Sequence, residues 1–150
     1  MISILERFNL STKLKLYHIS KEDLDNKLLT PRIPKNYMTK NNYENNTIPR
    51  ISFSTSIDGC LMGMSQNLKD TIFNVYEPED YNDLKIISNK DIIKNNYTPD
   101  AKITNEIWVI TPVKLKFVCK IKVLKAINHP LPYKYGNKTA NLYNWKWKVI

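Results

Sequence analysis

Three short stretches of the chain carry side chains that could do chemistry. His18 ends one alternating apolar run, Ser54, Thr55 and Ser56 end a second, and Glu106 opens a third. Imidazoles and hydroxyls hold ligands by hydrogen bonds, and a carboxylate stabilises positive charge that develops during a reaction. These residues form a site only if the fold brings the strand ends together.

Alternation of apolar and polar residues with period two is the main secondary-structure signal. In the first strand Leu14, Leu16 and His18 share one face, and in the second Phe53 and Ser54 lie on opposite faces. A residue at the end of such a strand can turn its side chain into a cleft above a split sheet. The strands predicted in this way span residues 14–20, 50–56, 72–76, 106–110, 113–124 and 145–149.

Between these strands the sequence predicts one clear helix and two irregular segments. Apolar residues recur at helical spacing over 57–68, with Ser56 as the N-cap and Asp58 in the first turn. Residues 21–49 are typical of a long functional loop, and the polar residues 77–100 are expected to hold short helical turns near 84–93. We therefore expect a single α+β domain over residues 1–150, with a mixed or split, mostly antiparallel sheet and a few short helices.

Composition indicates a folded domain in a reducing compartment. Hydrophobic residues make up 42% of the 150 residues, enough to bury a continuous core. Cys60 and Cys119 lie in apolar patterns that suit buried free thiols better than a disulfide framework. The apolar run at the N-terminus is too short for a signal peptide, and no apolar stretch reaches about 18 residues. We expect a cytoplasmic protein with no membrane association.

The chain is strongly basic, with 23 basic residues, 14 acidic residues and a net charge of +9. Such a charge is a first indication of a nucleic-acid partner. However, 20 of the basic residues are lysine, and an AT-rich genome produces abundant lysine without any functional demand. The alternating lysines of residues 113–124 are typical of a solvated sheet face. Nucleic acid is therefore a partner class that the sequence admits but does not favour.

Other chemical motifs are missing. The three glycines are too scattered to form a phosphate-binding loop. The two histidines and two cysteines do not have the spacing of zinc ligands, so we expect no metal site.

The three stretches together resemble the ADP-ribosyltransferase superfamily. Tyr-His-Ile-Ser at 17–20, Ile-Ser-Phe-Ser-Thr-Ser at 51–56 before a helix, and Asn-Glu-Ile-Trp at 105–108 are similar to motifs that surround the nicotinamide end of NAD in that superfamily. The resemblance runs from residue 14 to residue 110. It implies an ADP-ribosyltransferase-like outline, NAD as the substrate and transfer of ADP-ribose to a macromolecular acceptor.

The resemblance also implies a role for each residue. Glu106 would be catalytic, because release of nicotinamide builds positive charge on the ribose and a carboxylate that binds the ribose hydroxyls stabilises that charge. His18 would bind the ribose of the adenosine half, and Ser54 would position Glu106. Phe53 or Tyr43 would replace the aromatic residue that stacks on nicotinamide. The implied cofactor-binding set is His18, Ser20, Phe53, Ser54, Ser56 and Tyr43.

The chain departs from the family's pattern at several positions. Ile19 stands where the histidine-type members have glycine, and His18 stands where the serine-threonine-serine type has arginine. Thr104 replaces the acidic or amide residue that arginine-modifying members carry two places before the glutamate. Arginine is therefore not the implied acceptor, and a member without catalysis stays open.

Structural interpretations and a different function also stay open. His18 can be a core histidine, Ser56 caps the helix with or without a ligand, and Glu106 can mark a strand edge with a charge. The whole chain also resembles small basic proteins of low-GC bacteria and their phages. The alternative function is therefore a non-enzymatic protein that binds or inhibits a protein partner through residues 21–49 and the aromatic C-terminus.

Overall fold

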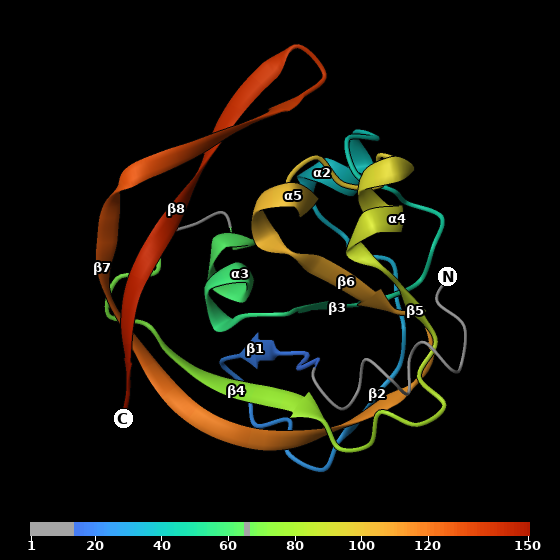
Figure 1. The fold of residues 1–150 in the computed structure, drawn as a ribbon, viewed down its shortest axis with the longest axis vertical. Helices are drawn as coiled ribbons and strands as arrows, with labels where there is room; N and C mark the ends of the chain where they lie inside the picture. Colours follow the sequence, from blue (N-terminus) through green and yellow to red (C-terminus); the bar gives the residue numbers. More distant parts are fainter. Residues whose placement is uncertain (1–13, 65–66) are drawn as a thin grey trace.

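Two antiparallel sheets form the framework of the fold (Figure 1). The structure is a computed structural model that describes residues 14–64 and 67–150, so the predictions about the N-terminal apolar run lie outside it. The larger sheet contains β1 (His18–Ser20), β2 (Leu28–Leu29), β4 (Ile72–Pro78), β7 (Val113–Tyr135) and β8 (Lys138–Val149). The smaller sheet contains β3 (Ile51–Ser54), β5 (Ile86–Ile87) and β6 (Glu106–Val109).

The two sheets meet at one bridge between Tyr17 and Ser54. Their main chains exchange two hydrogen bonds of 2.8 and 3.0 Å. Beyond this bridge β1 pairs with β4 and β3 pairs with β6, so the strands run in the order β5, β6, β3, β1, β4, β7 with a split between β3 and β1. The pairings among the described strands are all antiparallel. Of the two predicted arrangements, mixed or split, the described strands therefore form the split sheet.

The described part of the chain has four short helices among the strands: α2 (Tyr37–Lys40), α3 (Ile57–Met62), α4 (Asn89–Lys94) and α5 (Ala101–Thr104). The predicted N-cap of α3 is confirmed, because Ser56 Oγ accepts a hydrogen bond from the Gly59 N–H at 2.9 Å. The helix predicted over 57–68 is shorter, because it ends at Gly63, and glycine has a poor helix propensity. Among the described residues, no helix has the length and apolar character needed to cross a membrane.

Buried side chains gather on both sides of the split. One cluster, with Phe53, Tyr76 and Leu115, lies between β3, β6 and the first part of β7. A second, with Leu61 and Trp145, lies between α3 and the sheet of β4, β7 and β8. The cysteines are free, as predicted, but they are half-buried and not fully buried. Helix α3 is therefore packed against the strands that border the split.

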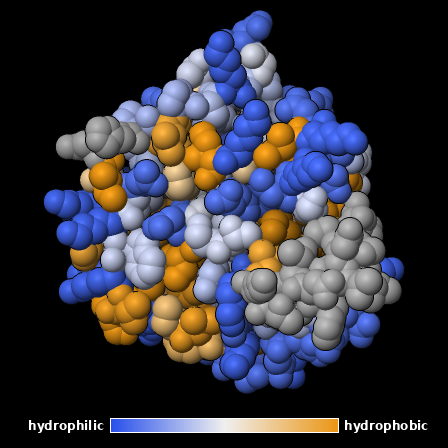
Figure 2. Space-filling model, in the orientation of Figure 1, coloured by the Kyte–Doolittle hydropathy of each residue, from blue (hydrophilic) through white to orange (hydrophobic). Residues whose placement is uncertain are grey.

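Strands β7 and β8 form one long hairpin that extends past the helices (Figure 1). The strands predicted at 113–124 and 145–149 are its two ends, and the sequence did not indicate that they continue toward each other. Gly136, with φ at +58°, makes the turn possible. On the face seen in Figure 2, exposed hydrophobic side chains lie in separate groups among hydrophilic ones, as is usual for a protein surface.

Candidate functional site

The strand ends that carry His18, Ser54 and Glu106 meet at the split. Ser54 lies directly opposite Glu106 in the β3–β6 register, and the residue before His18 is bridged to Ser54. All three residues line one small cavity of about 170 Å³, together with Phe53. Gly59 of α3 lines the same cavity. The fold therefore brings together four of the residues that the resemblance implied.

His18 is held by the main chain of the neighbouring sheet. Its Nδ1 lies 3.0 Å from the carbonyl oxygen of Ser52, and a carbonyl only accepts, so Nδ1 carries the proton. Burial lowers the pKa of His18 below its usual value, and the positive charge of Arg32 lowers it further, while the bond to Ser52 opposes these effects. A neutral ring with a proton on Nδ1 leaves Nε2 as a hydrogen-bond acceptor.

Ser54 and Ser56 use their hydroxyls within the protein. Ser54 Oγ donates to the carbonyl oxygen of Thr104 at 2.6 Å and accepts from the Ser56 N–H at 3.3 Å. Ser56 Oγ caps α3. The resemblance implies that Ser54 positions Glu106. In the structure the Ser54 hydroxyl donates instead to the carbonyl oxygen of Thr104 at the end of α5.

Glu106 is a half-buried carboxyl with one close partner. Trp108 Nε1 donates to Glu106 Oε2 at 2.6 Å. Burial raises the pKa of Glu106 to about 8, the nearby carboxyls of Asp100 and Glu44 act in the same direction, and Trp108 and Arg50 oppose it. With a pKa of about 8, Glu106 is mostly protonated at pH 7.

A buried arginine links Glu106 to the loop of residues 21–49. Arg50 is 2% exposed, and its guanidinium carbon lies 3.9 Å from the centre of the Trp108 ring. Its Nη2 forms an ion pair of 3.1 Å with Glu44, and its Nη1 donates to the Ile48 carbonyl at 2.9 Å. Arg50 Nε is buried without a hydrogen-bond partner. Arg50 therefore supports the indole ring that holds the carboxyl of Glu106.

The sequence analysis did not identify two further acidic residues near Glu106. Burial raises the pKa of Glu44 and also that of Asp100, against the opposing effects of Arg50 on Glu44 and of the Thr98 hydroxyl on Asp100. Glu44 and Asp100 both come from irregular segments, so no periodic pattern marks them. Only the tertiary contacts bring the three carboxyls to one place.

Two larger compartments adjoin the small cavity, and we call the three spaces together the cleft. The basic compartment, of about 550 Å³, is lined by residues that include His18, Ser20, Thr30, Arg32 and Arg50. The carboxyl compartment, of about 510 Å³, is lined by residues that include Glu44, Asp100, Glu106, Tyr133 and Tyr135. Ser52 lines the small cavity and both compartments, so the three spaces adjoin at this residue. Ser20 Oγ itself accepts a hydrogen bond from the Glu22 N–H at 3.0 Å.

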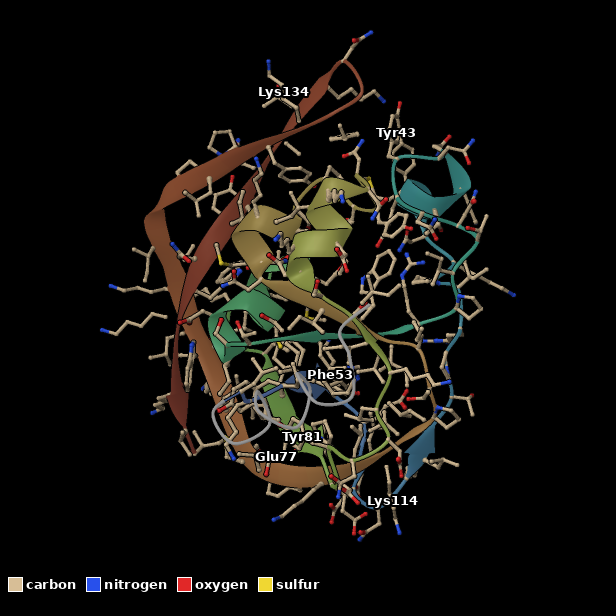
Figure 3. All side chains as sticks on the ribbon, turned by 45° about the vertical axis from the view of Figure 1, so that its right-hand side comes forward. Tyr43, Phe53, Glu77, Tyr81, Lys114 and Lys134 are labelled. Carbon is tan, nitrogen blue, oxygen red and sulfur yellow. The ribbon has the colours of Figure 1, made fainter. Side chains whose placement is uncertain are left out.

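Tyr43 lies apart from the lining of this cleft. Its ring meets Tyr135 edge-on, with centroids 4.9 Å apart, and also faces Tyr37 at 6.1 Å. Figure 3 shows Tyr43 beside α2, near the far end of the hairpin, while Phe53 lies in the interior. Tyr43 therefore fastens the hairpin tip to the loop, and the structure does not bring it to His18 and Glu106.

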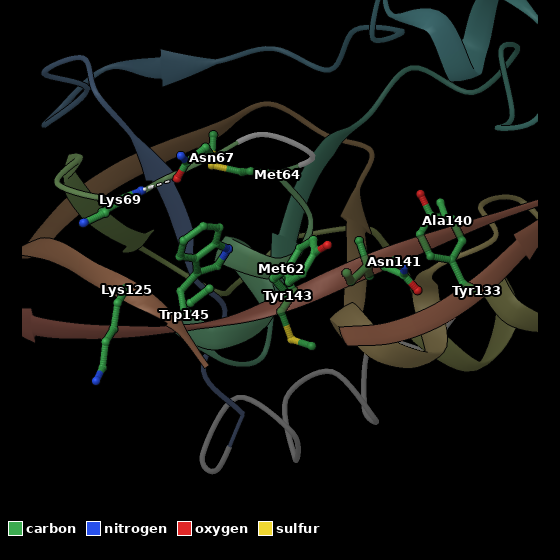
Figure 4. Close-up of a pocket in the computed structure, with 12 residues that line it drawn as sticks. Met62, Met64, Asn67, Lys69, Lys125, Tyr133, Ala140, Asn141, Tyr143 and Trp145 are labelled. Carbon is green, nitrogen blue, oxygen red and sulfur yellow. Dashed lines mark hydrogen bonds between the residues drawn. The ribbon is translucent and has the colours of Figure 1, made fainter. Parts of the chain in front are cut away.

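An apolar cavity of about 580 Å³ adjoins the carboxyl compartment (Figure 4). Met62, Met64, Tyr143 and Trp145 contribute much of its wall. Tyr133, Ala140 and Leu142 of the hairpin line both this cavity and the carboxyl compartment. The hairpin is therefore a shared wall between the two spaces.

Within residues 14–64 and 67–150, no group of three or more histidine, cysteine or carboxylate side chains is arranged to hold a metal ion. Comparison with known proteins adds no relative: no family model matches the chain, and neither a curated protein nor a solved structure matches it significantly. A function can therefore be argued only from the residues of the site.

Proposed function

We propose that the cleft binds NAD and that the chain is an ADP-ribosyltransferase-like protein that transfers ADP-ribose to a macromolecular acceptor. The observation that carries this proposal is the meeting of His18 and Glu106 in one cavity at the split. The sequence resemblance requires these two residues to face the same ligand. Their convergence supports it, because they come from different sheets.

The charges along the cleft suit the parts of NAD. Arg32 and Arg50 line the basic compartment, and the exposed guanidinium of Arg32 is a donor available to a negatively charged group such as the diphosphate. His18 Nε2 is an acceptor for a ribose hydroxyl. The carboxyl groups of Glu44, Asp100 and Glu106 in the carboxyl compartment suit the positively charged nicotinamide ring. NAD would therefore lie with its diphosphate near Arg32 and its nicotinamide near Glu106.

The proposed reaction needs few groups. The bond between the ribose carbon and the nicotinamide nitrogen breaks, and its electron pair leaves with nicotinamide. An acceptor nucleophile then forms a bond to the same carbon and releases its proton. Ionised Glu106 would bind the ribose hydroxyls and stabilise the positive sugar in between. The apolar cavity beside the hairpin is the space that we assign to the acceptor.

Calorimetric titration of the protein with NAD, with thermal melting alongside, tests the proposal. The wild type should bind intact NAD, His18→Ala should weaken binding about tenfold through loss of one ligand hydrogen bond, and Glu106→Gln should bind NAD but release no nicotinamide. Glu79→Gln is the matched control, since that exposed carboxylate lies outside the cleft, in a 3.8 Å pair with Lys114. No binding at millimolar NAD, with every variant folded, would exclude the proposal.

Binding of a protein partner is the second candidate function, and one observation favours it. The loop and the C-terminal hairpin, which the sequence suggested as separate contacts, form one surface: Tyr37 and Tyr43 of the loop meet Tyr135 and Lys138 of the hairpin, with Lys138 Nζ 3.0 Å from the Tyr37 hydroxyl. Aromatic residues are enriched in protein interfaces. A chain that ignores NAD but binds a purified partner, and loses that partner on Tyr37→Ala, would have this function instead.

A further inference from the structure

The net positive charge of the protein comes from the hairpin of β7 and β8. Residues 113–149 contain nine of the 23 basic residues and none of the 14 acidic ones, so the rest of the chain carries 14 of each and is neutral. An AT-rich genome explains why lysine is abundant. It does not explain why residues 113–149 contain no acidic residue beside their nine lysines.

Five of these lysines share one face of the hairpin. Lys122 lies directly opposite Lys148, and Lys125 lies directly opposite Lys146. Residues that pair in this way lie on the same side of a sheet, and the alternating neighbours Ile121, Val123 and Trp145 pack inward against α3. The outer lysine strip therefore faces away from the core and consists of Lys120, Lys122, Lys125, Lys146 and Lys148.

The charges of this strip are not balanced within the protein. At the other end of β7, Lys114 pairs with Glu79 at 3.8 Å, but no lysine of the strip forms an ion pair with a described residue. Like charges placed directly opposite each other destabilise a sheet. Repulsion among these lysines therefore lowers the stability of the sheet, and a bound anion would reduce that repulsion.

We propose that the outer lysine strip binds the phosphate backbone of duplex DNA. From Lys120 to Lys125 the strip is about 16 Å long at about 3.3 Å per residue. A duplex carries about one phosphate per 1.7 Å of its axis with both strands counted, so a length of about 16 Å offers more phosphates than the five lysines of the strip can contact. The tryptophans beside the strip do not offer a stacking platform for unpaired bases, because Trp145 is 9% exposed and Trp147 Nε1 donates to Asp58 at 2.7 Å.

This contact carries no base-reading group, so binding is independent of sequence and sensitive to salt. The strip faces away from α3, and of its five lysines only Lys125 also lines the apolar cavity beside the hairpin. The sequence alone showed lysines along one strand. The structure adds the second row from β8 and shows no ion pair between these lysines and a described residue.

Fluorescence anisotropy with a labelled 20-base-pair duplex, measured from 50 to 200 mM NaCl, tests the proposal. The logarithm of the binding constant should fall with the logarithm of salt with a slope of about −4. Lys122→Gln with Lys148→Gln, and separately Lys125→Gln with Lys146→Gln, should each reduce the slope by about 2 in magnitude. Using two independent pairs protects the test against one variant that folds poorly.

Lys90→Gln with Lys94→Gln is the matched control, because it removes the same charge from the exposed face of α4 and should leave the slope unchanged. An equal loss in this control would mean that binding follows net charge alone, and the strip would not be the site. No binding at 50 mM NaCl, tighter binding to a single strand of the same length, or binding to phosphatidylserine vesicles in place of the duplex would each overturn the proposal.

Discussion

Glu106 shows how neighbouring residues decide what one carboxyl can do. Its pKa of about 8 follows first from burial and then from the charges of Asp100 and Glu44. A neutral carboxyl donates a hydrogen bond but does not stabilise a positive sugar, so Glu106 must lose its proton before it can act in the proposed reaction. A positively charged nicotinamide ring would favour the ionised form, and the ligand would thereby help to prepare its own catalyst.

The same pKa predicts how stability depends on pH. The pKa of Glu106 lies near its ordinary value of 4.5 in the unfolded chain and at about 8 in the folded one. Between these values the folded protein binds more protons, so this group makes the protein less stable as pH rises from about 5 to 8. Glu106→Gln removes this effect, and its melting temperature should exceed that of the wild type by a margin that grows over this range.

Thermal melting at several pH values measures that margin. Glu79→Gln, on the exposed surface, should show a margin that stays constant. A constant margin for Glu106→Gln as well would show that Glu106 does not have a raised pKa.

At the scale of elements, Gly59 within α3 and Gly63 at its C-cap differ in how closely neighbouring atoms approach them. A Cβ added to Gly59 would collide with Ser54 Oγ and with the carbonyl oxygen of Thr104, the two atoms whose hydrogen bond ties β3 to α5. Gly63 has only ordinary contacts, the nearest at 3.6 Å. The close approach at Gly59 therefore holds the helix against the strand ends of the site.

Gly59→Ala should lower the free energy of unfolding by about 1–3 kcal/mol, the usual cost of overpacking, despite the better helix propensity of alanine. Urea unfolding provides the measurement. Gly63→Ala in the same helix should change stability by less than about 0.5 kcal/mol. Equal effects of the two changes would mean that the contact between Gly59 and Ser54 does not position α3.

For the whole molecule, the concentration of positive charge in the hairpin lowers the stability of the free protein but favours the binding of an anion. The hairpin carries all of the net charge, and its opposed lysines repel each other. Natural sequences lose such pairs easily, because one substitution relieves the repulsion. Retaining them is reasonable if the strip is covered by an anion when the protein functions.

Lys148→Glu should therefore stabilise the free protein while it weakens duplex binding. A glutamate directly opposite Lys122 replaces a repulsive pair with an attractive one, which should add about 0.5–1 kcal/mol to the free energy of unfolding in low salt and less at high salt. Urea unfolding at two salt concentrations measures this gain. Lys35→Glu, in an exposed loop with no lysine opposite it, should bring a smaller gain, and an equal gain there would show that only net charge matters.

Local features of this protein were predictable from sequence because local physics produces them. Alternation located the strands that carry His18, Ser54 and Glu106, and the hydroxyl of Ser56 identified the start of α3. Helix length was less predictable, because the apolar spacing of Met64 and Leu68 continued past the glycine that ends the helix. Leu68 is buried in the core and Met64 packs against it, so the apolar spacing of these residues reflects their burial and not a helical conformation.

By itself the sequence determined the strand periodicity, the helix cap, the amount of positive charge and the residue types available for chemistry. The tertiary structure alone decided that Glu44 and Asp100 raise the pKa of Glu106, that Ser54 bonds to Thr104 and not to Glu106, and that β8 doubles the row of lysines on β7. These outcomes depend on contacts between residues far apart in the chain. No local pattern encodes such contacts, because burial and the approach of charges exist only once the sheets have closed on each other.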